Sequence, residues 1–192
     1  MAGVPGALFV LGQASGAVIW GFSMERIGRR WGLGIGQVIG VIGSAIAVVA
    51  VVNRSFLFFL IGLVFVGIAR SAVDLGRFAA AEVHLPRKRG RAISNVILGS
   101  TVGAIFGPLL VAPTGTLAMK AGFPELAGPY GVGIAVLVLA AVLILCGLKP
   151  EPRDIGRELA SLHPESVPSQ TTRSLAEIVR QPGVVVSMVT MV

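Results

Sequence analysis

Arg70, Asp74 and Arg77 are three charged residues within one long apolar stretch of the chain. They are spaced four and three residues apart, so on a helix they occupy one face. Charges inside an apolar helix are costly, and they normally pair with one another or face a cavity. Asp74 can neutralise one arginine, which leaves a net positive site. Two interpretations stay open: a substrate or proton path, and an ion cluster that only holds the helix in register.

A second charged group follows the first apolar stretch, in the sequence from Gly21 to Arg30. Its glycines allow a close helix approach and a turn with positive φ. Its carboxylate, Glu25, suits an ion pair with Arg29 or the capping of a helix N-terminus. An ordinary basic loop is the simpler interpretation, but the order of residues is more constrained than such a loop needs. The pattern consists of Gly21, Glu25, Arg26, Gly28, Arg29 and Arg30.

A third pattern is a run of small residues at four-residue spacing: Gly99, Gly103, Gly107 and then Pro108. Such a stripe lets another helix pack closely in a membrane, and the proline removes one backbone hydrogen bond and bends the helix. Simple helix packing explains the stripe as well, because Gly32, Gly36 and Gly40 have similar spacing.

The composition indicates which elements must position these residues. Apolar residues make up 54% of the 192, charged residues only 13%, and the mean hydropathy is +0.86, whereas soluble domains carry about 25% charged residues. The net charge of +7 does not indicate nucleic-acid binding, because the basic residues lie between apolar runs. The sequence contains no metal-ligand cluster, catalytic constellation or phosphate-binding loop, so we predict no cofactor, no metal and no enzyme.

Five apolar stretches are long enough to cross a bilayer, which takes roughly 20 residues. We expect spans at about 4–24, 31–52, 55–83, 92–112 and 128–147 of a transmembrane bundle formed by residues 1–148. The successive connections hold three, one, four, one and five Lys or Arg residues. Because cytoplasmic loops are rich in these residues, the odd-numbered connections are predicted to be cytoplasmic and the N-terminus outside.

Residues 149–181 read as a proline-rich cytoplasmic linker. A capping box at Ser174 and Glu177 predicts a short helix on the inner membrane surface. Residues 183–192 resemble the start of a sixth span that the chain does not complete.

The order Gly-x-x-x-acid-Arg-x-Gly-Arg-Arg from Gly21 to Arg30 resembles the signature loop of the major facilitator superfamily, with Glu25 where that family usually has Asp. The resemblance implies that the first span corresponds to the family's second helix. It also implies that this loop docks on the other half of the transporter and helps to control alternating access. The basic segment from Glu82 to Arg91 looks like the family's corresponding loop one repeat further on.

The Gly99 to Pro108 stripe is similar to a motif of proton-driven drug antiporters in this superfamily, although Leu109 follows where the fuller motif has a further glycine. This resemblance favours antiport. The arginine that the family often places before a conserved glycine of its fourth helix is absent, with Leu63 before Gly67. The role of Arg70 therefore rests on its apolar surroundings alone.

The sequence thus predicts an all-α, polytopic transmembrane bundle that is part of a secondary transporter, without its first helix and most of its C-terminal half. Its expected partners are the lipid bilayer, a small-molecule substrate and that missing half, with protons as the coupling ion and the bacterial inner membrane as its location. A non-transporting membrane module or an inactive remnant is the main alternative. A membrane-embedded enzyme is a weaker one.

Overall fold

The computed structural model describes residues 3–162, except for the side chains of residues 86 and 160. This part of the chain is helical throughout, with short connections and no strand. Its helices, in chain order, are α1 (Val4–Ile27), α2 (Arg29–Val52), α3 (Phe56–Glu82), α4 (Pro86–Lys120), α5 (Ala127–Gly147) and α6 (Pro152–Leu162).

Helices α1 to α5 are each long and apolar enough to cross a membrane. Their positions agree with the five predicted spans, because each span is a charge-poor stretch of roughly the length that a bilayer core requires. The predicted all-α membrane bundle is therefore confirmed for the described residues.

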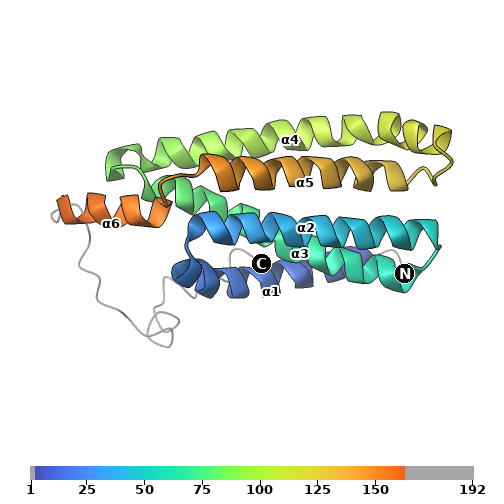
Figure 1. The fold of residues 1–192 in the computed structure, drawn as a ribbon, viewed down its shortest axis with the longest axis horizontal. Helices are drawn as coiled ribbons and strands as arrows, with labels where there is room; N and C mark the ends of the chain where they lie inside the picture. The colour runs from blue at the N-terminus through green and yellow to red at the C-terminus, as the bar shows by residue number, and fades with distance from the viewer. Residues whose placement is uncertain (1–2, 163–192) are drawn as a thin grey trace. The chain divides into compact units, whose positions relative to one another are not determined.

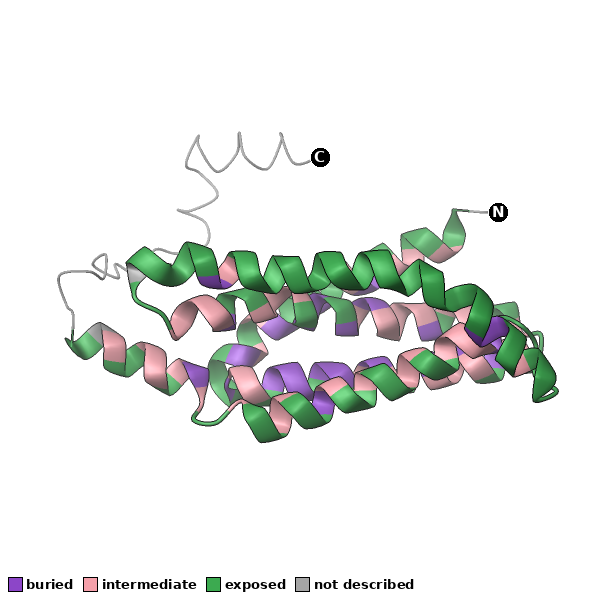
Figure 2. Cartoon of the chain, turned by 90° about the horizontal axis from the view of Figure 1, so that it is seen from above, coloured by how far each residue is buried: buried purple, intermediate pink, exposed green. Residues whose placement is uncertain are grey.

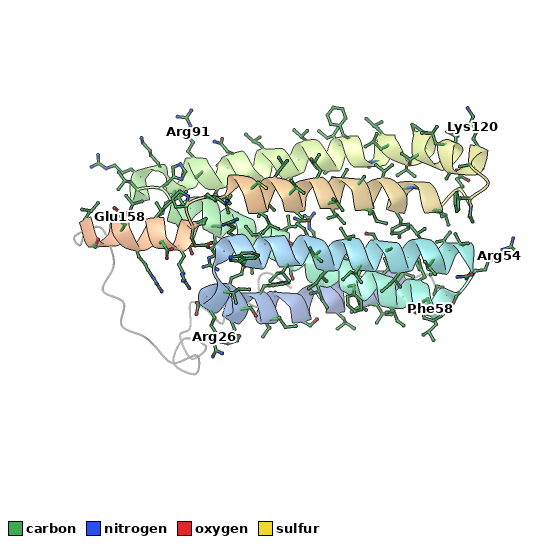
Figure 3. The ribbon with its side chains drawn as sticks, in the orientation of Figure 1. Arg26, Arg54, Phe58, Arg91, Lys120 and Glu158 are labelled. Atoms are coloured by element: carbon green, nitrogen blue, oxygen red, sulfur yellow. The ribbon has the colours of Figure 1, made fainter. Side chains whose placement is uncertain are left out.

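The five long helices run antiparallel to their neighbours in sequence (Figure 1). Helix α3 contacts α1, α2 and α4, while α5 contacts α2 and α4. Arg26 and Arg91 lie at one end of this bundle, and Arg54 and Lys120 lie at the other (Figure 3). We call the end with Arg26 and Arg91 the basic end, because the arginine-rich α1–α2 connection and the basic first turns of α4 are located there.

Small residues let the backbones of α1 and α3 approach closely. A Cβ atom on Gly12 would overlap the backbone of Val64, and one on Gly67 would overlap the carbonyl oxygen of Phe9. Trp20 of α1 is 3% exposed, and its indole Nε1 donates a 3.0 Å hydrogen bond to the carbonyl of Ile68. Because backbone contact of this kind needs glycine, the α1–α3 interface is fixed in register.

The core of the bundle is narrow, and its outer faces are apolar. Figure 2 shows buried residues where helices face one another and exposed residues over the outside, with α4 exposed along most of its length. Four leucines illustrate this, because each is more than half exposed: Leu11 at 62%, Leu57 at 68%, Leu109 at 63% and Leu139 at 58%. Such surface is stable in the hydrocarbon core of a bilayer.

Helix α4 is longer than the predicted span 92–112. Its 35 residues extend for about 52 Å, which exceeds the roughly 30 Å of bilayer hydrocarbon, so its charged first turns can lie in the headgroup region. Arg87, Lys88, Arg89 and Arg91, expected in a loop, belong to these turns. The helix continues through both Pro108 and Pro113.

Helix α6 begins within the segment that the sequence indicated as a linker. Pro152 stands in its first turn, where a missing N–H costs nothing, and Asp154 complements the helix dipole there. The remaining linker, the predicted short helix at Ser174 and the predicted span 183–192 lie outside the described residues.

Candidate functional site

Gly28 alone connects α1 and α2 at the basic end. Its φ of 93° and ψ of 163° lie in a region that is essentially restricted to glycine. A Cβ atom on Gly28 would also stand 2.7 Å from Oε1 of Glu151. The predicted positive φ at Gly28 is present, and a neighbouring carboxylate adds a steric requirement for glycine.

Arg29 forms a forked ion pair with Glu82 at the end of α3. Its Nη2 lies 2.6 Å from Glu82 Oε1, and its Nε lies 3.1 Å from Oε2. The two side chains are 17% and 32% exposed. Two parallel hydrogen bonds between a guanidinium and a carboxylate are strong and geometrically specific, so this pair fixes the α1–α2 connection to α3.

Charged side chains also cap three helix ends at the basic end of the bundle. Oε1 of Glu151 accepts hydrogen bonds from the backbone N–H groups of Arg29 and Arg30, at 2.5 and 3.1 Å, at the start of α2. Arg153 Nη1 donates to the carbonyl of Glu25 in the last turn of α1, at 2.7 Å.

Arg30 in turn donates from Nε, at 2.9 Å, and from Nη2 to the carbonyl of Leu145 in the last turn of α5. Terminal backbone groups of helices lack partners within the helix, and the sign of each cap complements the helix dipole. The basic end is therefore one connected network, which we call the end clamp: Arg29, Arg30, Glu82, Glu151 and Arg153.

The structure corrects the two local roles expected for Glu25. Arg29 pairs with Glu82 rather than with Glu25, and Glu151 caps α2 in its place. Glu25 and Arg26 are exposed, and their side chains form no ion pair within the described part of the chain. A Cβ atom on Gly21 would meet nothing within 4 Å, so no described helix uses the close approach that Gly21 permits.

The three charges of α3 form a partly paired cluster that begins near its midpoint and continues towards its C-terminal end. Arg70 follows Phe56 by 14 residues, about 21 Å along a helix of about 40 Å. Its Nε lies 3.4 Å from Oδ1 of Asp74, and Oδ2 of Asp74 accepts a 2.9 Å hydrogen bond from Nε2 of Gln13 on α1. The spacing predicted the Arg70–Asp74 pair, whereas Gln13 comes from a helix packed against α3.

Arg77 stays apart from this pair. Its guanidinium lies 5.2 Å from the centre of the Phe78 ring, and it has no ion pair with any residue in the described range. Arg70 and Asp74 are half-exposed, at 52% and 34%. The face therefore combines a neutral pair and one further cation, which agrees with the net positive site expected from the sequence.

The glycine stripe of α4 is exposed. Cβ atoms on Gly99, Gly103 and Gly107 would each meet nothing within 4 Å, so no described helix packs closely on them. Gly103, Gly107 and Val111 line a cavity of about 420 Å³ between α4 and α5. Helix α5 instead approaches α4 through Gly128, where a Cβ atom would overlap the backbone of Thr114.

Comparison with known proteins agrees with this geometry. The family model of the Major Facilitator Superfamily matches residues 1–192. The chain belongs to this superfamily. Its relatives are transporters, so the chain is an integral membrane protein of a transporter family.

Three relatives show how much of a transporter the chain represents. It is 36% identical to the uncharacterized MFS-type transporter YdeG of Bacillus subtilis over 85% of its length, and 31% identical to the uncharacterized MFS-type transporter YddS of that organism over 100%. It is 34% identical over 96% of its length to the riboflavin transporter RfnT of Brucella anthropi. These matches cover 38%, 44% and 44% of the relatives, so the chain spans less than half their length. No solved structure matches the chain.

Sequence reasoning missed three residues that the structure places at these sites: Gln13, Glu151 and Arg153. It also missed that Glu82 pairs with Arg29. Only Glu151 and Arg153 carried a local signal, as an acid and an arginine on either side of a helix-starting proline. Their partners lie more than 100 residues away in sequence, so no spacing rule links them.

Proposed function

We propose that the chain is one half of a secondary active transporter, which moves a small molecule by alternating access and couples this movement to protons. In such proteins two helical bundles rock around a binding site near the bilayer midplane. The second bundle would be contributed by sequence corresponding to the rest of the matched relatives.

The observation that carries this proposal is the pairing of Asp74, which follows Phe56 by 18 residues, about 27 Å along the roughly 40 Å of α3. Asp74 is held by Arg70 and Gln13, on a helix apolar enough to span the membrane. An ionisable group within a membrane span is costly, and such groups commonly mark substrate or proton paths. Protonation of Asp74 would remove the charge that neutralises Arg70, and so would change which substrate or ion the site favours.

The end clamp supports a rigid-body movement of this half. It ties α1, α2, α3 and α5 together through hydrogen bonds and one ion pair. Glu25 and Arg26 remain exposed at the same end. We infer that Glu25 docks on the second bundle of the transporter and that the end clamp transmits the movement of this contact to α1, α2, α3 and α5. The segment from Gly21 to Arg30 would then act as the gating loop.

The stripe from Gly99 to Pro108 supports antiport through its resemblance to the motif of proton-driven drug antiporters. Its glycines meet no described side chain, and a flat stripe of this kind suits close contact with another helix. We assign that contact to a helix of the second bundle, and the whole transporter to a bacterial inner membrane.

The test is substrate movement in vesicles that contain the product of the full-length gene. Riboflavin is the first substrate to assay, because one relative is named as a riboflavin transporter. We expect movement that depends on a proton gradient and loses that dependence in Asp74→Asn. The matched control is Asp154→Asn on α6, which makes the same chemical change at a side chain that is 63% exposed. Equal gradient dependence in both variants would overturn the coupling role of Asp74, and no movement by the wild type would favour the non-transporting module.

A further inference from the structure

A cavity of about 430 Å³ lies at the basic end, between α3, α4 and the connection from α5 to α6. Its volume is within the usual range for ligand sites, roughly 300–1,000 Å³. The lining of the cavity includes Gly76 and Ala80 of α3, Val83 directly after α3, Val96 of α4, and Leu148 and Ile155. These walls are apolar and built from small residues on α3, so the cavity can hold a hydrocarbon chain.

Two polar side chains, His84 and Lys149, stand among the residues that line this cavity. Lys149 is exposed and has no ion pair with any residue from 3 to 162. The two carboxylates nearest to Lys149 in sequence have partners, since Glu151 caps α2 and Asp154 pairs with Arg153 at 3.8 Å. Glu82, at the end of α3, pairs with Arg29. The lining therefore combines an apolar interior with one uncompensated positive charge.

The surroundings of the cavity add further positive charge. The turn that contains His84 leads directly into α4, whose first turns carry Arg87, Lys88, Arg89 and Arg91. Nε of Arg89 donates a 3.2 Å hydrogen bond to the carbonyl of His84. Clusters of this kind next to membrane helices lie on the cytoplasmic side and attract the anionic lipids of that leaflet.

We propose that this cavity binds an anionic phospholipid of the inner leaflet. The lipid phosphate pairs with Lys149 beside His84, and an acyl chain lies along Gly76 and Ala80. A free phosphate would leave the apolar walls empty. The phosphate of a zwitterionic lipid could also pair with Lys149, but its ammonium group would add a cation beside the basic first turns of α4 and leave the net positive charge of the site uncompensated. This site is separate from the charged face of α3, so its test needs no transport assay.

The experiment is native mass spectrometry of the delipidated chain, with phosphatidylglycerol or phosphatidylcholine added in detergent. We expect phosphatidylglycerol to bind at least fivefold more tightly, and Lys149→Ala to weaken its binding by about fivefold, the effect of one lysine near an anionic surface. Lys120→Ala is the matched control, because it removes the same charge at the other end of the bundle (Figure 3).

A cavity-filling variant tests the apolar part of the site. A Cβ atom on Gly76 meets only Cδ2 of Leu33, at an ordinary 3.5 Å, so Gly76→Leu fits the helix and occupies the cavity. We expect it to displace phosphatidylglycerol, and Ala80→Leu fills the same space if Gly76→Leu does not fold. Any of three results would overturn the proposal. The two lipids could bind equally, Lys149→Ala and Lys120→Ala could have equal effects, or phosphatidylglycerol could bind fully to the cavity-filling variants.

Discussion

Gly28, next to Glu151 of the end clamp, is the position where we expect a single added methyl group to destabilise the bundle most clearly. Its φ of 93° and ψ of 163° are unfavourable for any residue with a side chain, and the cost of such strain is about 1–3 kcal/mol. A Cβ atom would also press on Glu151 from 2.7 Å and displace the carboxylate that caps α2, which adds about 1 kcal/mol. Gly28→Ala should therefore lower the free energy of unfolding by about 2–4 kcal/mol.

Gly21 provides a control within the same loop motif. It lies inside α1, where a Cβ atom meets nothing within 4 Å. Alanine is favoured over glycine in a helix by about 0.5–1 kcal/mol, so Gly21→Ala should leave stability unchanged or raise it. The two identical substitutions, seven residues apart, are expected to have opposite effects.

The assay is unfolding of the purified chain in mixed micelles as the fraction of SDS is raised, followed by the fluorescence of buried Trp20. A second background, Glu151→Ala, separates the two contributions. There Gly28→Ala should still cost the backbone strain but no longer the displaced cap. If Gly28→Ala and Gly21→Ala behaved alike in the wild-type background, the assignment of Gly28 to a glycine-only conformation would be refuted.

Two further pairs of substitutions test the contacts of the bundle in the same unfolding assay. Glu82→Gln removes the carboxylate that pairs with Arg29 and should lower the free energy of unfolding by about 1.5–3 kcal/mol. Asp154→Asn removes an exposed ion pair of 3.8 Å and should lower it by less than about 1 kcal/mol. Equal losses of stability would contradict a stabilising role for the Arg29–Glu82 pair. Gly67→Ala places a Cβ atom against the backbone of α1 and should cost about 1–3 kcal/mol. Gly99→Ala meets open space and should cost nothing, so a similar loss in both would argue against the close α1–α3 contact.

The sequence predicted the long helices well because their signal is local. A charge-poor stretch of sufficient length predicts a span without any knowledge of its neighbours, and each of the five stretches forms a helix long and apolar enough to cross a membrane. The limits of α4 were less accurate, because basic first turns read as a loop when only hydropathy is considered. Helix α6 was missed because prolines at Pro150 and Pro152 indicated a linker, although proline also fits a first helical turn.

The contacts of the candidate sites were predictable only where they are local. Arg70 and Asp74 are four residues apart, so helix geometry alone brings them together. Gln13 forms a hydrogen bond with Asp74 because glycines let α1 approach α3. Arg29 pairs with Glu82, which is 53 residues away in sequence. These partners depend on how the helices pack, which spacing along the chain does not determine.

The most direct test of the central claim is the movement of protons when substrate is added to vesicles that contain the full-length transporter. A pH-sensitive dye inside the vesicles reports this movement, and exchange of labelled substrate at equilibrium reports binding and conformational change separately. We predict that Asp74→Asn abolishes the pH change while exchange continues, and that Asp154→Asn retains both. A full pH change in Asp74→Asn would contradict the account, because the carboxylate held by Arg70 and Gln13 would then not be the group that carries the proton.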